Sequence, residues 1–213
     1  QWQLNWQDDQ LWQFGFGVLS AKAEYDYRSQ RVLFKSFDQQ RQVLARDIDL
    51  SFDGQQYHAY LNHKYQISEK LFSELGIRWD RQTNLGFGDS QFSPRASLVY
   101  IPDRQTRLGA SWGRYYQADD MLELQVTDGV REFSRAQQSQ HSILSYQQLL
   151  GQGFSIRAEL YRKELVNPKA RYENVFDPYV LFPESHADRV LIAPESSRLE
   201  GVEISVQHNA SES

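Results

Sequence analysis

The sequence predicts an all-β fold, an antiparallel meander of long strands forming part of a transmembrane β-barrel wall. Three observations lead to this prediction: apolar and polar residues alternate, the strands are long, and short links alternate with long ones. Successive links of a meander lie at opposite ends of the sheet, so the short turns gather at one end and the long loops at the other. Barrels of the outer membrane sort their links in this way.

Alternation is clearest in residues 57–79 and 94–113, two hairpins with tight turns. In the second hairpin, one face carries Ala96, Leu98, Ala110 and Trp112, and the other carries Arg95, Arg107 and Ser111. A period of two over such lengths is typical of strands with one apolar face. We therefore expect the first set to face lipid and the second to face the lumen.

Strand length supports the same interpretation. The predicted strands are roughly 10–14 residues long, whereas soluble strands are usually about 5–6 and membrane-spanning ones need about 9–11. The expected long links are residues 28–46, 118–140 and 164–197.

Residues 11–28 alternate less regularly. Apolar residues stand at even positions from Trp12 to Val18 and at odd positions from Ala21 to Tyr27. A β-bulge would produce this shift. A strand that leaves the membrane and continues as an external extension would produce it as well, and the sequence leaves both open.

Composition excludes several classes of protein. No run of about 18 apolar residues is present, which excludes a helical membrane protein but not a barrel. The aromatic fraction of 14% fits aromatic girdles at the membrane interfaces, and also an aromatic-rich soluble β domain. The net charge is -5 without a basic block, so no nucleic acid partner is expected. Without cysteine, disulfides and thiolate metal sites are impossible.

No residue pattern points to catalysis. The five histidines form no paired metal motif, and the turn at Gly86, Phe87 and Gly88 lacks the helix that a phosphate loop needs. For carboxylate pairs such as Asp119 and Asp120, the sequence does not set the distance between the two carboxylates, so it gives no basis for acid–base catalysis. We therefore expect no enzyme, no catalytic residue, no metal site and no cofactor.

Several segments resemble one family. Residues 93–100 read SPRASLVY, and residues 106–116 read TRLGASWGRYY. This strand pair resembles the barrel of TonB-dependent outer-membrane receptors, although Asp119 stands where the following loop of the family usually has proline. Residues 157–163 (RAELYRK) and 201–204 (GVEI) resemble later strands of that barrel. The resemblance extends over residues 11–207.

The resemblance implies a bacterial outer-membrane receptor for energy-coupled uptake of a scarce nutrient such as a siderophore-iron complex. The implied partners are that nutrient ligand, outer-membrane lipid, and the TonB complex acting through a plug domain. Neither the plug nor a final strand ending in an aromatic residue is recognisable, and the family's barrels have 22 strands. We therefore expect residues 1–213 to be one partial barrel domain from inside such a receptor.

In this family the ligand binds to external loops and to the plug apex. Guanidinium groups and aromatic rings suit anionic or catecholate ligands. The predicted ligand-binding residues are Arg114, Tyr116, Arg131, Arg171 and Tyr172. The alternative for each is an ordinary loop residue, an aromatic that packs or an arginine in solvent.

Two other functions remain open at this stage. A plug-free porin-like channel would share the barrel, and a plug sequence upstream would exclude it. A soluble carbohydrate-binding β domain would share the strands, and a requirement for detergent would argue against it.

Overall fold

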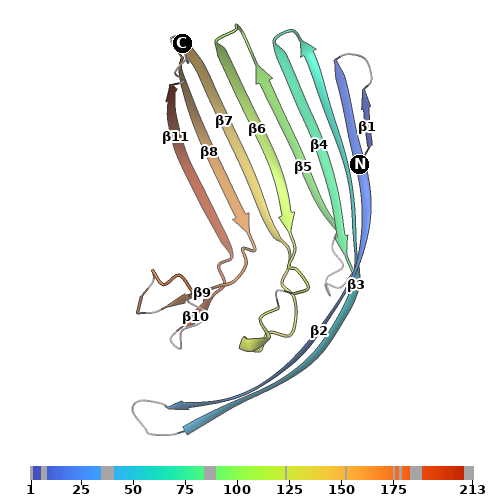
Figure 1. Cartoon of the computed structure of the whole chain (residues 1–213), viewed down its shortest axis with the longest axis vertical. Helices are drawn as coiled ribbons and strands as arrows, with labels where there is room; N and C mark the ends of the chain where they lie inside the picture. The colour runs from blue at the N-terminus through green and yellow to red at the C-terminus, as the bar shows by residue number, and fades with distance from the viewer. Residues whose placement is uncertain are drawn as a thin grey trace, which may run out of the picture.

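The protein forms one antiparallel sheet of nine strands, ordered β1-β2-β3-β4-β5-β6-β7-β8-β11 (Figure 1). The computed structural model describes residues 2–5, 9–34, 41–83, 90–122, 124–151, 153–174, 176–177, 179–182 and 189–208. The sheet strands are β1 (Trp2–Asn5), β2 (Gln10–Phe34), β3 (Arg41–Ser68), β4 (Leu71–Gln82), β5 (Ser90–Tyr100), β6 (Thr106–Gln117), β7 (Gln137–Gly151), β8 (Phe154–Val166) and β11 (Ser196–His208). The predicted all-β antiparallel fold is confirmed.

Two small elements lie outside the sheet. Strands β9 (Arg171–Asn174) and β10 (Arg189–Ile192) form a hairpin of their own, and η1 (Val126–Asp128) is a single 3₁₀ turn. Within the described part of the chain, no helix is long and apolar enough to cross a membrane.

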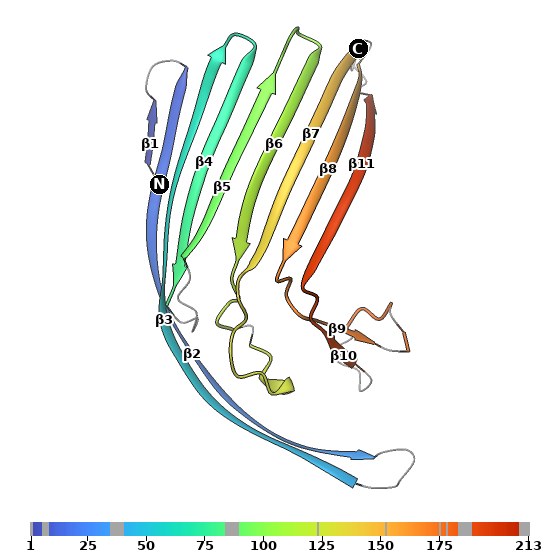
Figure 2. The same ribbon diagram turned by 180° about the vertical axis from the view of Figure 1, so that it is seen from behind.

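Links of the two lengths are sorted to opposite ends of the sheet, as predicted (Figure 2). The turns after β3, β5 and β7 lie at one end, called here the turn end. The Asp103 carboxylate accepts hydrogen bonds from the backbone N–H groups of Gln105 (2.8 Å) and Thr106 (2.9 Å), which tightens the turn before β6. The longer links after β4, β6 and β8 lie at the other end, called here the loop end.

Strand pairing separates apolar from polar side chains across the whole sheet. Register places Leu98, Ala110, Leu144, Leu160 and Val202 in one row across five strands. We call this side the apolar face, and it includes Ala96 and Trp112. Arg95, Arg107 and Ser111 lie on the opposite side, the polar face. The two predicted sets therefore occupy opposite faces.

Nothing in the described part of the chain covers the apolar face. Its large side chains are exposed, with 57% of Leu144 and 66% of Val202 accessible. The described apolar residues that are buried, Ala23, Ile48, Met121, Leu124 and Phe133, lie in a loop or in the part of β2 and β3 that extends beyond β4. A sheet with this much uncovered apolar surface needs an apolar surrounding to be stable.

The apolar residues form a belt that runs obliquely across the strands. At the loop end the belt reaches Trp79 and Phe92 on β4 and β5, but it ends at Leu160 and Val202 on β8 and β11. The belt therefore extends farther toward the loop end on β4 and β5 than on β8 and β11, as expected of strands that tilt relative to the membrane normal.

Strands β2 and β3 extend far beyond their neighbours as one hairpin. They pair continuously from Gln10 with Tyr65 to Phe34 with Arg41 and show no register shift. The predicted long link at residues 28–46 is therefore wrong, because strand continues to Phe34 and resumes at Arg41. The alternative of a β-bulge within residues 11–28 is wrong too, because β2 continues without a register shift as an extended strand.

The shift in apolar residues along β2 reflects a change of surroundings. Phe16 and Val18 lie on the apolar face and are exposed, at 71% and 60%. Ala21, Ala23 and Tyr25 lie on the other side of the same strand and pack against the loop between β6 and β7. The hairpin thus keeps its geometry while its apolar side changes from one face to the other.

A small hydrophobic core joins the extended hairpin to that loop. Ala23 packs with Met121, Leu124 and Phe133, and the Phe133 ring lies 4.9 Å from that of Phe52. The Tyr25 hydroxyl donates a hydrogen bond to the Met121 carbonyl and accepts one from the Leu124 N–H at 3.3 Å. We call these residues the loop core.

Replacing Phe133 by Ala should loosen the loop while leaving the nine-stranded sheet intact. Phe133 is only 7% exposed, and emptying such a site costs about 3–5 kcal/mol. Hydrogen–deuterium exchange should become faster in residues 118–136 and in the extended part of β2 and β3. Phe16→Ala, which removes an exposed ring of the same kind, is the matched control. Equal effects of the two substitutions on the loop would contradict this account of the core.

Candidate functional site

A charged cluster at the loop end ties three separate segments together. The Asp128 carboxylate of η1 binds Arg189 of β10 at 2.5 Å and lies 3.8 Å from Arg46 of β3. Arg46 also donates a hydrogen bond to the Thr127 carbonyl. The Arg189 guanidinium lies 4.9 Å from the centre of the Tyr172 ring on β9. We call Arg46, Asp128, Tyr172 and Arg189 the loop clamp.

The loop clamp is largely shielded from solvent, which strengthens its interactions. The side chains of Arg189, Asp128 and Arg46 expose 16%, 17% and 25% of their surface. Water and salt screen an ion pair at this depth less than they screen a pair on the surface. Removing one partner would leave the other with a poorly solvated charge. Two guanidinium groups meet one carboxylate, so the clamp carries a net positive charge.

Two groups of the loop clamp have shifted pKa values. Burial alone would raise the pKa of Asp128, but the Tyr172 hydroxyl and the Arg189 guanidinium outweigh it and lower that pKa. Burial raises the pKa of Tyr172 to about 12, and the nearby carboxylate acts in the same direction. The Tyr172 hydroxyl is shielded from water and has no described hydrogen-bond partner of normal geometry. Asp128 nevertheless lies close enough to Tyr172 to raise the pKa of its hydroxyl.

A cavity of about 310 Å³ opens beside the clamp, between the β6–β7 loop and the β9–β10 hairpin. Its apolar lining comes from Leu124, Phe133 and Leu191, and Tyr172 contributes to it as well. The ion pair between Asp119 and Lys169, at 3.4 Å, lies at the same site. Such a lining suits a small group with both an apolar and a polar part.

Three of the five predicted ligand-binding residues lie in the links and the β9–β10 hairpin at this loop end. Tyr172 belongs to the loop clamp and lines the cavity. Arg131 is exposed and donates a hydrogen bond to the Asp47 carbonyl at 3.2 Å. Arg171 is exposed and pairs with Glu173 at 2.8 Å.

The other two predicted residues lie on β6, near the loop end but on the apolar face of the sheet. Arg114 and Tyr116 are the next alternate residues of β6 after Ala110 and Trp112, so their side chains belong to the apolar face. Tyr116 donates a hydrogen bond to the Gln138 side chain at 2.8 Å. The structure therefore does not bring Arg114 and Tyr116 together with Tyr172.

Sequence reasoning missed Arg46 and Asp128. Arg46 stands in the predicted long link at residues 28–46, although Asp47 and Asp49 alternate with Ile48 and Leu50, which is a strand signal. Asp128 has no local signal, because its partners come from β3 and β10 and only the fold brings them together.

The polar face carries paired charges rather than a metal centre. Arg78 binds Asp80 through two hydrogen bonds of 2.7 and 2.8 Å, and Asn62, only 4% exposed, donates to Glu74 at 2.8 Å. Among the described residues, no group of three His, Asp or Glu side chains could hold a metal ion.

The family model for the TonB-dependent receptor-like β-barrel matches residues 1–209, nearly the whole chain. The chain belongs to this family. The resemblance to TonB-dependent receptors that the sequence motifs indicate is therefore confirmed. TonB-dependent receptors are bacterial outer-membrane transporters and not enzymes. No curated protein matches the chain in sequence.

Solved structures of such receptors share the fold at low sequence identity. The siderophore receptor PirA from Acinetobacter baumannii superposes with a TM-score of 0.66 and 12% identity over 99% of this chain. A variant of the ferric enterobactin receptor PfeA from Pseudomonas aeruginosa gives 0.64 and 14% over 95%, in a complex with enterobactin. The FrpB iron transporter from Neisseria meningitidis gives 0.62 and 11% over 98%. The chain spans 33%, 31% and 32% of these three proteins.

Replacing Asp128 by Asn should bring the pKa of Tyr172 down from about 12 toward its ordinary 10.0. Because the folded pKa is raised, the neutral phenol stabilises the fold fully below pH 10.0, and this contribution is lost as pH rises through 12. An ultraviolet titration of tyrosinate, read as the difference from Tyr172→Phe, measures the shift. Asp177→Asn, in the neighbouring loop, is the control. An unchanged titration in Asp128→Asn would refute the proximity of the two groups.

Proposed function

We propose that this chain is part of the barrel wall and external loops of an outer-membrane receptor that imports a scarce nutrient, such as a siderophore-iron complex. The observation that carries the proposal is the family match over residues 1–209. Solved relatives of the same fold, described as siderophore receptors and iron transporters, support this class of ligand.

The uncovered apolar face supports a membrane location. On this proposal the oblique belt meets lipid, the polar face lines the lumen, and the long loops lie outside the cell. Residues 1–213 form one partial barrel domain of a longer protein, since the solved relatives are about three times as long. Energy reaches the receptor from the TonB complex through a plug domain encoded elsewhere in that protein.

Neither rival function gains support from an observation of its own. A soluble carbohydrate-binding domain would bury its apolar face, whereas this face is open in the described part of the chain. A plug-free porin would share the wall, but the family match supports the receptor.

The nutrient would bind at the loop end, beside the loop clamp. Arg131 and Arg171 present exposed guanidinium groups there, and Tyr172 lines the cavity. Guanidinium groups bind carboxylates and catecholates through paired, charge-assisted hydrogen bonds. Arg114 and Tyr116 lie on the apolar face and would not reach a ligand in the lumen.

Uptake of labelled iron chelates tests this function directly. Deleting the gene should abolish uptake of at least one chelate under iron limitation. In the complete receptor, Arg131→Ala together with Arg171→Ala should raise the Kd for that chelate by about tenfold or more, given about 1.5–3 kcal/mol for hydrogen bonds to charged groups. Arg104→Ala, at the turn end, is the control. Normal uptake of every chelate in the deletion strain would reject the proposal.

The two faces of β5 should differ sharply in their tolerance of charge. Leu98→Arg in the complete receptor should cost about 2–4 kcal/mol near the bilayer midplane, because it places a guanidinium in hydrocarbon. Ser97→Arg, one residue away on the polar face, should cost much less. Folding in lipid vesicles, followed by denaturant titration, measures both. Equal costs at the two positions would contradict a lipid-facing belt.

A further inference from the structure

We propose that the apolar face carries a specific binding site for a phosphate-bearing lipid of the external leaflet. The site consists of a groove for acyl chains and a cationic group at the loop end of that groove. This inference rests on the proposed membrane location, but it concerns a different surface from the nutrient site.

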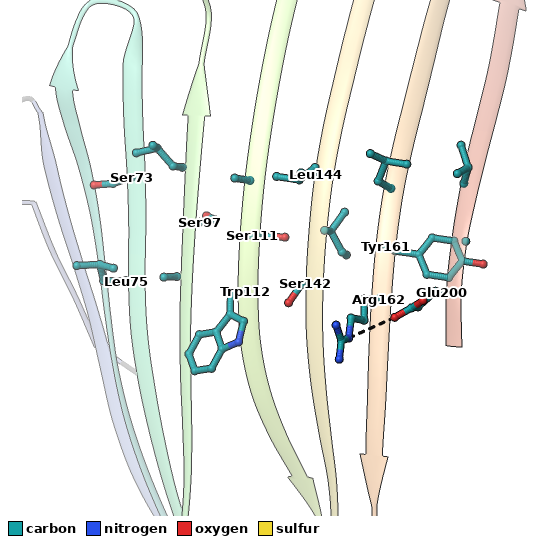
Figure 3. A pocket seen from close by; sticks show the side chains of 17 residues that line it. Ser73, Leu75, Ser97, Ser111, Trp112, Ser142, Leu144, Tyr161, Arg162 and Glu200 are labelled. Atoms are coloured by element: carbon teal, nitrogen blue, oxygen red, sulfur yellow. Dashed lines mark ion pairs between the residues drawn. The ribbon is translucent and has the colours of Figure 1, made fainter. Parts of the chain in front are cut away.

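The groove is an open hollow of about 870 Å³ that crosses β4 to β11 on the apolar face (Figure 3). The small side chains of Ala96, Ala110 and Ser142 leave space between the larger Leu98, Leu144 and Trp112. A second hollow of about 580 Å³ continues it toward the turn end and shares Leu98, Ala110 and Leu144. Together the two hollows form an apolar surface that crosses the strands and extends toward the turn end, which suits the burial of acyl-chain methylene groups.

Polar groups begin abruptly at the loop end of the groove. Arg162 and Glu200 pair at 3.5 Å on the last row that lines it. In the next row, register places Arg114, Gln140, Glu164 and Arg198 side by side across four strands. Because these residues share the face of Leu160 and Val202, they mark the depth at which that face leaves hydrocarbon.

Charges in these two rows do not balance. Three guanidinium groups, those of Arg114, Arg162 and Arg198, meet two carboxylates. Glu164 already binds Arg162 at 2.9 Å and Arg198 at 3.2 Å. One positive charge is therefore left over, and an anion would complete the cluster.

Arg114 is the group that holds the surplus charge. Its Nε is shielded from solvent and has no hydrogen-bond partner, and among the described residues no ion pair involves Arg114. It stands two residues beyond Trp112, whose ring lies at the same end of the groove (Figure 3). A guanidinium presents a planar fork of donors that matches phosphate oxygens. A phosphate at Arg114 would place its acyl chains in the groove below.

Lipid retention by the complete receptor, measured by native mass spectrometry, tests the site. The probes are dioleoyl phosphatidylglycerol, a galactosyl diacylglycerol without phosphate, and inorganic phosphate. We expect retention of the phosphatidylglycerol above the galactolipid. Arg114→Gln should weaken phosphatidylglycerol binding by about tenfold, the loss expected for one charge-assisted contact. Ala110→Phe, which fills the groove, should weaken binding of both lipids.

Arg107→Gln, on the polar face of the same strand, is the matched control and should retain lipid normally. Equal retention of both lipids, or no effect of Arg114→Gln, would overturn the proposal. Displacement of phosphatidylglycerol by inorganic phosphate would also overturn it, because the site would then recognise the anion alone. Loss of chelate uptake in Arg114→Gln with unchanged lipid retention would place Arg114 on the nutrient path instead. Lipid retention does not depend on transport, so it can succeed even if the proposed nutrient function fails.

Discussion

Register between neighbouring strands is the constraint on which the rest of this structure depends. Side chains of a strand alternate strictly, so a slip of one residue would exchange the two faces of every strand that followed. The described pairings shift only between Gln66 and Ser68 and between Leu149 and Gly151, both beside turns at the turn end. Within the belt the pairing is continuous. The row of Leu98, Ala110, Leu144, Leu160 and Val202 is therefore apolar across five strands, and Arg95 and Arg107 stay on the other side.

The wall of the sheet could be predicted from the sequence, because its period of two is a local signal. Positions such as Leu98 and Arg95 reveal their faces through neighbours one and two residues away. The extended hairpin was harder to predict, since its outer side is polar at exposed residues such as Asp47 and Asp49. Its apolar partners, Met121 and Phe133, follow far along the chain.

Long-range contacts set the limit for the candidate site as well. Asp128 and Arg189 are 61 residues apart in the sequence, and neither segment carries a local pattern that predicts their ion pair. The position of Arg114 is a different case, because its parity with Trp112 was visible in the sequence. The predicted ligand-binding role grouped Arg114 with external loop residues, whereas it lies within β6, which continues to Gln117. Knowing where a strand ends therefore decides on which side its last residues lie.

The loop core links the extended hairpin to the β6–β7 loop, and this linkage bears on how such proteins diversify. Met121 and Phe133 need Ala23 and Phe52 opposite them, so a change of volume in one segment requires a compensating change in the other. Residues 118–136 grafted alone onto a related barrel would leave their apolar side chains without a support. The β6–β7 loop and the extended hairpin therefore have to change together, and we expect the two segments to coevolve.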